Sequence, residues 1–63
     1  MLDRFIREYE CRRITGLSRT TRWREERAGR FPRKYKISKS AMAYRESEVM
    51  AWLDMRSQEV THV

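Results

Sequence analysis

Apolar residues near the start of the chain are spaced as on one side of a helix. Cys11, Ile14 and Leu17 recur at every third position, and that spacing keeps side chains on one helix face. Most residues of the segment 7–14 are good helix formers. Gly16 follows, and a glycine just past a helix end supplies the left-handed backbone that stops it. The pattern predicts a first short helix over residues 7–14.

A second short helix is predicted over residues 19–28. Ser18 stands immediately before it, where a hydroxyl can accept a backbone N–H from the first turn. Gly29 stands immediately after it as a stop signal. Two short helices joined by a tight turn that contains glycine form the helix-turn-helix pattern.

The middle of the chain alternates apolar and polar residues with the period of a strand. Pro32 breaks helix and forces extended backbone on the residue before it. Beyond it come two runs of about four residues each, separated by residues 38–41. Their apolar positions are Tyr35 and Ile37 in the first run and Met42 and Tyr44 in the second. The alternation predicts a small β-hairpin.

The clearest helix is predicted over residues 46–57. Its apolar stripe has the spacing i, i+3 and i+4, and two acids lie in its first turn, where the helix dipole favours them. The stripe consists of Val49, Trp52 and Leu53, and the acids are Glu46 and Glu48. We expect this helix to pack on the first two, with Trp52 in the core.

These elements predict a mainly α fold with a small two-stranded β-hairpin: three short helices, the first two of them in a helix-turn-helix arrangement. No internal repeat or low-complexity tract interrupts the chain. We expect residues 1–57 to form a single domain and residues 58–63, which have no pattern, to be a frayed tail.

Length and cysteine content argue against an enzyme. A domain of 63 residues buries only about 60% of the surface of its unfolded chain and leaves no room for a deep catalytic pocket. Cys11 is the only cysteine, and His62 lies in the predicted tail. Cys11 is therefore expected to be a small buried hydrophobe rather than a nucleophile or metal ligand. We predict no catalytic residue, no metal and no cofactor.

The charge of the chain indicates a polyanionic partner. Fifteen Lys and Arg against nine Asp and Glu give a formal net charge of +6, which is typical of proteins that bind nucleic acid. Binding to an anionic membrane would favour one continuous amphipathic helix, whereas these cations are spread over a helix, a loop and a hairpin. No apolar run is long enough for a signal peptide or a membrane span. We expect a soluble, cytoplasmic protein with no membrane partner.

Three sequence blocks resemble the AlpA family of prophage regulators. They are Gly-Leu-Ser-Arg-Thr-Thr at 16–21, Gly-Arg-Phe-Pro at 29–32, and Ala-Tyr-Arg-Glu-Ser-Glu-Val at 43–49 with Ala-Trp at 51–52. The blocks come in the family's order and spacing, and the resemblance runs from about residue 4 to residue 53. The family is related to the excisionases and, more distantly, to the winged-helix domains of MerR regulators.

The resemblance implies a winged-helix-like fold in a bacterial protein encoded on a prophage or an integrated island. Family members activate or repress transcription, or direct the integrase towards excision. The implied partners are double-stranded DNA at the nucleoid and a phage-type integrase. This chain departs from the family at Arg22 and Glu25, where relatives often carry apolar residues. Either the second helix packs through Leu17, Thr21 and the alkyl stems of its arginines, or its inner face is weaker than usual.

The second helix carries the residues expected to read DNA. In a helix-turn-helix its first turns reach the base edges, where arginine can contact guanine and threonine can touch a thymine methyl. A helix N-terminus with a serine cap suits a phosphate. The candidates are Ser18, Arg19, Thr20, Thr21, Arg22, Trp23 and Arg24.

The alternative for these residues is a solvated charged face. In that case Arg22 would pair with Glu26, and Arg24 with Glu25 or Glu26. Trp23 could stack on sugar or lie against the DNA backbone, but a tryptophan on a short helix favours packing inside the protein. The sequence does not separate phosphate contacts from base contacts.

The hairpin carries a second group of candidates. Four cations and two serines lie on it and on its approach: Arg33, Lys34, Lys36, Ser38, Lys39 and Ser40. By analogy with related folds, a wing here would contact the DNA backbone or the minor groove. The alternative is that lysines on an edge strand discourage aggregation.

The leading hypothesis is sequence-specific DNA binding, as a transcriptional regulator or as an excisionase that sets the direction of recombination. One helix and one wing read few base pairs, so we expect cooperative self-association on repeated sites or an integrase partner. The alternative is a protein-interaction module that modulates a regulator or an integrase without DNA. RNA binding is a weaker option, because the pattern lacks an aromatic platform for unpaired bases.

Overall fold

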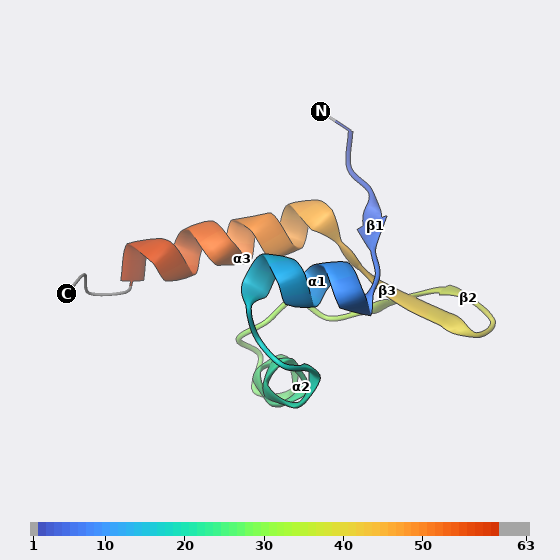
Figure 1. Ribbon diagram of the computed structural model, residues 1–63, viewed down its shortest axis with the longest axis horizontal. Helices are drawn as coiled ribbons and strands as arrows, with labels where there is room; N and C mark the ends of the chain where they lie inside the picture. Colours follow the sequence, from blue (N-terminus) through green and yellow to red (C-terminus); the bar gives the residue numbers. More distant parts are fainter. Residues whose placement is uncertain (1, 60–63) are drawn as a thin grey trace.

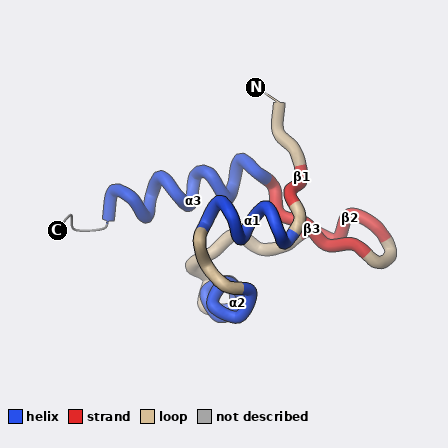
Figure 2. Tube along the Cα trace, viewed as in Figure 1, coloured by secondary structure: helices blue, strands red, loops and turns tan. Residues whose placement is uncertain are grey.

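The fold is a winged helix-turn-helix of three helices and a small antiparallel sheet (Figures 1 and 2). The computed structural model describes residues 2–59. In chain order the elements are β1 (Phe5–Ile6), α1 (Glu8–Thr15), α2 (Arg19–Arg27), β2 (Tyr35–Ser38), β3 (Ala41–Arg45) and α3 (Glu46–Glu59). The predicted helices and hairpin are confirmed, with small differences at the helix ends.

α1 and α3 lie side by side, whereas α2 is seen nearly end-on beneath α1 in Figure 1. The hairpin of β2 and β3 extends away on the side opposite the C-terminal end of α3. The prediction that α3 packs on both other helices holds directly for α1. The segment after α2 makes the link to α3, because the Trp52 indole N–H donates to the Arg30 carbonyl at 2.9 Å.

The sheet has a third strand that the sequence pattern does not reveal. β1 pairs antiparallel with β3, which gives the order β1-β3-β2. Its register places Phe5 opposite Arg45 and Ile6 opposite Tyr44. The predicted two-stranded wing is thus a three-stranded sheet, and β1 brings the buried side chain of Ile6 into the core. A strand of two residues is too short to show an alternating pattern.

The hairpin turns one of its faces towards α2. Lys36 lies opposite Met42, and residues directly opposite each other in an antiparallel pair share a face of the sheet. Tyr44, two residues on, lies on the same face, and its hydroxyl reaches Arg22 of α2 at 3.4 Å. The register shifts between Lys36 and Ser38. The hairpin face that carries Lys36 is therefore the face turned towards α2.

The predicted signals at the ends of α2 are confirmed. The Ser18 hydroxyl accepts the backbone N–H of Thr21 at 3.2 Å, which caps the helix start. At the other end Gly29 has φ +79°, its N–H donates to the Glu26 carbonyl, and the next N–H, of Arg30, donates to the Glu25 carbonyl. These two bonds form a Schellman motif, which requires the left-handed backbone that glycine adopts without strain.

Asp3 caps α3 from the opposite end of the chain. Its carboxylate accepts the backbone N–H of Ser47 at 3.0 Å, the Ser47 hydroxyl at 2.8 Å and the Nε–H of Arg45 at 2.9 Å. These bonds, those from Ser47 first, lower the pKa of Asp3 to about 2. An acid at a helix N-terminus satisfies orphan N–H groups and interacts favourably with the helix dipole.

We expect the contribution of Asp3 to depend on acid pH. A carboxyl whose pKa is lowered on folding stabilises the protein above its unfolded pKa, and this stabilisation is lost as pH falls through the folded pKa. The urea midpoint of wild type should therefore exceed that of Asp3→Asn at pH 6, and the gap should close between about pH 4 and about pH 2.

The control for this prediction is Asp54→Asn. Asp54 is an exposed acid of the same helix, and its side chain makes no hydrogen bond or ion pair among residues 2–59. A gap between Asp3→Asn and wild type that stays constant from pH 6 to pH 2 would contradict the proposed role of the Asp3 carboxylate.

The core gathers side chains from α1, the sheet, α3 and the segment after α2. Phe31 is its centre: its ring lies 5.6 Å from the Tyr44 ring and 4.9 Å from the Trp52 ring, both in edge-to-face geometry. Cys11 and Val49 are fully buried beside them. The predicted core positions of Cys11, Val49 and Trp52 are confirmed, and Leu53 packs against this cluster while partly exposed.

α3 is longer than its apolar stripe indicates. The helix continues to Glu59, so the prediction of a frayed tail is wrong for Gln58 and Glu59. An ion pair from Arg56 to Glu59 supports this last turn. The rest of the predicted tail, with His62, lies outside the described residues. Within the described part of the chain, no helix combines the length and apolar character needed to cross a membrane.

Candidate nucleic-acid interface

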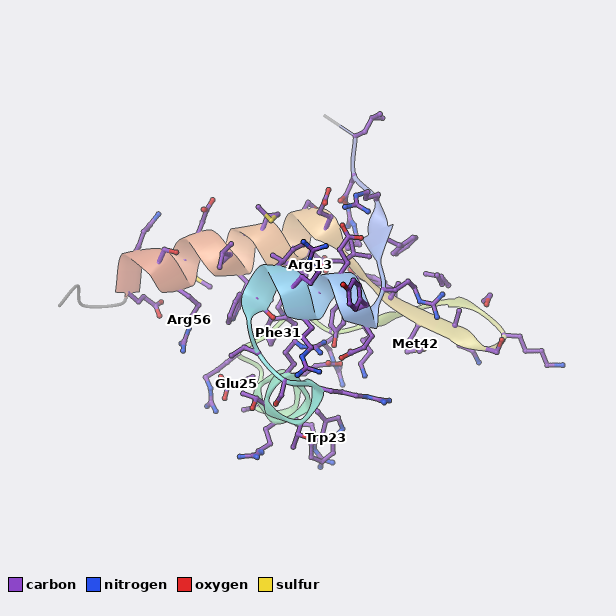
Figure 3. The ribbon with its side chains drawn as sticks, in the orientation of Figure 1. Arg13, Trp23, Glu25, Phe31, Met42 and Arg56 are labelled. Atoms are coloured by element: carbon purple, nitrogen blue, oxygen red, sulfur yellow. The ribbon has the colours of Figure 1, made fainter. Side chains whose placement is uncertain are left out.

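The side chains of α2 divide into an inner and an outer face with the period of a helix. Thr20, Trp23, Arg24 and Arg27 lie on the outer face, and all four are exposed. The inner face carries three charged residues that are buried or half-buried: Arg22, Glu25 and Glu26. In Figure 3 the side chain of Trp23 projects from α2 away from α1 and α3.

Arg22 belongs to the inner face and is fully buried, with 0% of its surface exposed. The Glu8 carboxylate of α1 accepts two hydrogen bonds from its guanidinium, one of them at 2.9 Å. The Nε–H donates to the Leu17 carbonyl at 3.1 Å, and Nη1 lies 3.4 Å from the Tyr44 hydroxyl. The prediction that Arg22 contacts DNA is wrong, because its guanidinium is already used to hold α1, the turn and β3 together.

The groups around Arg22 form a connected polar network. Hydrogen bonds from Arg22 lower the pKa of Glu8, so this carboxyl stays ionised. The Tyr44 hydroxyl donates to Glu26 at 3.5 Å, and burial, followed by the charge of Glu26, raises the pKa of Tyr44 to about 12. Burial also raises the pKa of the Cys11 thiol. At neutral pH Glu8 is therefore ionised, whereas the Tyr44 hydroxyl and the Cys11 thiol are neutral.

Glu25 is half-buried and pairs with Arg30, which follows the Schellman turn. Two hydrogen bonds of 2.9 Å join its carboxylate to the Arg30 guanidinium. The pairs that the sequence offered as an alternative, Arg22 with Glu26 and Arg24 with Glu25 or Glu26, are not formed among residues 2–59. The acids of α2 therefore serve its inner face and its end, and leave the outer face without a negative charge.

Trp23 lies on the outer face with 49% of its surface exposed. The prediction that it packs inside the protein is wrong. Arg27, one turn further on, places its guanidinium 4.9 Å from the centre of the Trp23 ring system, a cation–π contact. Arg27 is not among the predicted DNA contacts, which end at Arg24, although the helical repeat from Thr20 through Trp23 and Arg24 reaches it.

The start of α2 offers both charge and backbone donors. The hydroxyl of Ser18 donates to Thr21 Oγ1 at 3.0 Å, so these two hydroxyls primarily hold the turn. Arg19 and Thr20 are exposed, and N–H groups in the first turn of a helix have no partner within the helix. A helix start of this kind can receive a phosphate oxygen.

The hairpin candidates lie at the surface beside α2. Arg33, Lys36, Ser38, Lys39 and Ser40 are exposed, and Lys39 and Ser40 form the turn between β2 and β3. Lys34 is half-buried, and its backbone N–H donates to Glu26 of α2 at 3.3 Å. The approach to the hairpin therefore adjoins α2 at Glu26.

Ion pairing separates two groups of basic residues. Among residues 2–59, ion pairs with acids occupy Arg4, Arg22, Arg30, Arg45 and Arg56. No ion pair in this part of the chain involves Arg19, Arg24, Arg27, Arg33, Lys34, Lys36 or Lys39. The other cations without one are Arg7, before α1, and Arg12 and Arg13 in it. Unneutralised charge is thus concentrated on the outer face of α2 and on the hairpin with its approach.

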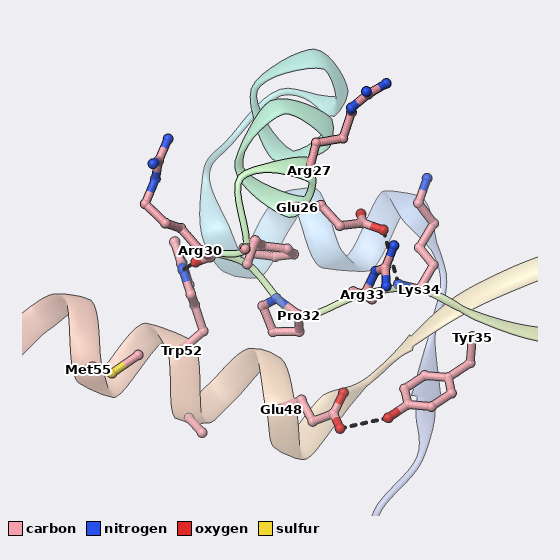
Figure 4. A pocket seen from close by; sticks show the side chains of 13 residues that line it. Glu26, Arg27, Arg30, Pro32, Arg33, Lys34, Tyr35, Glu48, Trp52 and Met55 are labelled. Atoms are coloured by element: carbon pink, nitrogen blue, oxygen red, sulfur yellow. Dashed lines mark hydrogen bonds between the residues drawn. The ribbon is translucent and has the colours of Figure 1, made fainter.

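A groove of different character lies between the end of α2, the segment 29–35 and α3 (Figure 4). Its apolar lining includes Pro32, Trp52 and Met55, and the Tyr35 hydroxyl donates to Glu48 across one end at 2.8 Å. Four cations and two acids also line it: Arg27, Arg30, Arg33, Lys34, Glu26 and Glu48. Within the described residues, no cluster of three or more His, Cys, Asp or Glu could hold a metal ion.

The winged helix-turn-helix and its basic face agree with the comparison to known families. The family model described as prophage CP4-57 regulatory protein (AlpA) matches residues 4–57. No curated protein matches the chain. The family match covers most of the 63 residues and includes α1, α2, the hairpin and most of α3. The chain therefore belongs to the AlpA family of prophage regulatory proteins, as the resemblance of its three sequence blocks indicated.

Proposed function

We propose that this protein binds double-stranded DNA, with α2 in the major groove and the hairpin on the flanking backbone or minor groove. Residues 1–57 act as the single DNA-binding domain. The observation that carries the proposal is the charge segregation described above: cations without acid partners gather on the outer face of α2 and on the adjoining hairpin. Such a surface attracts a polyanion and releases its counterions on binding.

In this proposal α2 and the hairpin make different kinds of contact with DNA. Arg19, Thr20 and Arg24 extend from the first turns of α2, which reach base edges when such a helix enters the major groove. Arginine there binds guanine in a bidentate manner or holds a phosphate. Lys36 and Lys39 of the hairpin have flexible, point-like charges that suit phosphate oxygens. In this proposal α2 provides specificity and the hairpin provides affinity.

The biological role follows from the family and from the size of the surface. A regulator of a prophage or island would bind near its promoters, and an excisionase would bind beside the attachment site and work with the integrase. A single helix and a short wing contact few base pairs, so either role requires several copies or a partner on neighbouring sites. We propose cooperative binding to repeated sites, which would place the protein at the nucleoid.

A footprint and gel-shift series tests the proposal directly. The DNA would span the attachment site and nearby promoters, and the salt concentration would be varied at each step. We expect several protected sites in tandem and a log–log salt slope near 0.9 for each phosphate contact. A lone protected site would argue against cooperativity. Absence of any footprint above nonspecific binding at low salt would overturn DNA binding itself.

We expect the hairpin variant Lys36→Gln, Lys39→Gln to weaken binding to all sequences alike. Both side chains are exposed and make no ion pair within the described residues, so their loss removes phosphate contacts without disturbing the fold. The salt slope should fall by about 2, since each contact contributes about 0.9. Titrations at four salt concentrations on specific and scrambled DNA measure both quantities.

The control for the hairpin variant removes the same charge elsewhere. Arg12→Gln, Arg13→Gln changes two exposed cations of α1 and gives an identical net charge. An equal fall in slope for both variants would contradict a specific hairpin contact and indicate only the effect of overall charge.

The groove beside α3 favours a second candidate function, a protein-interaction module. Its apolar lining, which includes Pro32, Trp52 and Met55, and the presence of acids beside its cations resemble a protein-binding surface more than a phosphate-binding one. If no DNA footprint is found, direct binding to a phage-type integrase becomes the next measurement. A complex that persists with Trp23→Ala, a residue that does not line the groove, and fails with Met55→Glu would support this alternative.

A further inference from the structure

Trp23 is the one large apolar side chain on the outer face of α2. Its companions on the exposed side of the helix are Arg19, Thr20, Arg24 and Arg27. The core is built without it, around Phe31, and nearly half of the indole is in contact with solvent. Removing a tryptophan surface from water is favourable. An indole exposed among cations is therefore suited to contact an apolar group on a bound polyanion.

Arg27 fixes the orientation of this indole. The two residues are spaced i, i+4, so they are neighbours on the helix surface, and the guanidinium lies 4.9 Å from the centre of the Trp23 ring system. Arg33 and Glu26 line a shallow hollow next to the same pair. The guanidinium sits over the ring system, and this contact favours the position of the side chain that the structure shows. Arg27 is thus a positioning residue for Trp23.

The major groove presents one apolar group at the base edges, the 5-methyl group of thymine. Trp23 stands one turn along α2 from Arg19 and Thr20 and beside Arg24, within the part of the helix that reaches base edges. Resting on the proposed DNA binding, we infer that Trp23, held by Arg27, contacts a thymine methyl in the target site. Specificity for that thymine would come from the apolar contact that Trp23 makes, while the arginines on either side bind neighbouring bases or phosphates.

Removing the methyl group from the DNA tests this inference. Each thymine of a footprinted site is replaced in turn by deoxyuridine, which lacks the methyl and keeps the same base pairing. We expect one replacement to weaken wild-type binding about fourfold, the effect of one buried methyl-sized group. The same replacement should have no effect on Trp23→Ala, which already lacks the contact.

Tyr9→Ala is the matched control. Tyr9 is likewise an exposed aromatic with an arginine above its ring, Arg13 at 5.9 Å, but it lies on α1. This variant should keep the full fourfold sensitivity to deoxyuridine. Arg27→Gln, which frees the indole, should reduce the sensitivity while leaving some affinity. Circular dichroism verifies that each variant is folded.

Three outcomes would overturn the inference. Wild type could bind every deoxyuridine site as tightly as the thymine site, or Trp23→Ala could remain as sensitive as wild type. Either result removes the methyl contact and leaves DNA binding intact. If no footprint exists on unmodified DNA, the proposed function fails, and the methyl contact fails with it.

Discussion

Glu8→Ala is expected to destabilise the protein by about 2–4 kcal/mol, because it leaves the buried Arg22 guanidinium without its counter-charge. Arg22 has 0% of its surface exposed, whereas the Glu8 side chain is 45% exposed. Water can replace part of the lost carboxylate, which keeps the cost below that of a fully buried pair. In a small domain with a total stability of about 5 kcal/mol, the variant should unfold at a urea concentration well below the wild-type midpoint.

Two further variants separate the buried charge from ordinary surface electrostatics. Glu10→Ala removes the carboxylate that pairs with Arg4, and both of those side chains are substantially exposed, so it should lower the urea midpoint much less than Glu8→Ala does. Glu8→Ala combined with Arg22→Met removes the uncompensated charge and should recover much of the loss. A Glu8→Ala midpoint no lower than that of Glu10→Ala would contradict the structural role of the pair.

The local signals of the sequence account for most of the fold. The serine cap of α2, the glycines that end α1 and α2 and the alternation around the hairpin turn each depend on a few neighbouring residues. The structure has them where they were predicted. Signals of this kind do not need a tertiary partner, so they can be read from one sequence.

Features that depend on distant partners were missed. β1 is a strand only because β3 lies beside it, and Asp3 caps α3 only because that strand brings it there. Arg22 and Trp23 also depend on distant partners, since these decide which of the two side chains is buried. Adjacent residues on a helix point about 100° apart, so only one of them can face the core. Hydrophobicity favoured Trp23, but Glu8 and Tyr44, distant in sequence, give Arg22 the partners that make its burial possible.

The burial of Arg22 and the exposure of Trp23 make the outer face of α2 suitable for binding DNA. Arg22 lies inside, and the acids of α2 are occupied by Arg30 and the Tyr44 hydroxyl. The outer face therefore presents Trp23, Arg24 and Arg27, with Arg19 exposed at the start of the helix. The network beneath the face and the proposed contacts on it are therefore parts of one arrangement.

Arg19→Ala, Arg24→Ala is expected to raise the Kd for the specific site by at least about 30-fold, since each bidentate arginine contact contributes at least about 1 kcal/mol and the two together at least about 2 kcal/mol. Both side chains are exposed and make no ion pair among residues 2–59, so urea unfolding should change little. Binding to scrambled DNA should weaken much less, which lowers the specificity ratio, whereas the hairpin variant should preserve that ratio.

The α1 variant Arg12→Ala, Arg13→Ala carries the same net charge and is the reference for this measurement. Gel shifts on specific and scrambled DNA, at one fixed salt concentration, give the two ratios. If the α1 variant loses as much specificity as the α2 variant, then α2 does not read the bases, and the protein binds DNA through its overall charge. If only the α2 variant loses it, the helix that keeps Arg22 inside is the helix that selects the site.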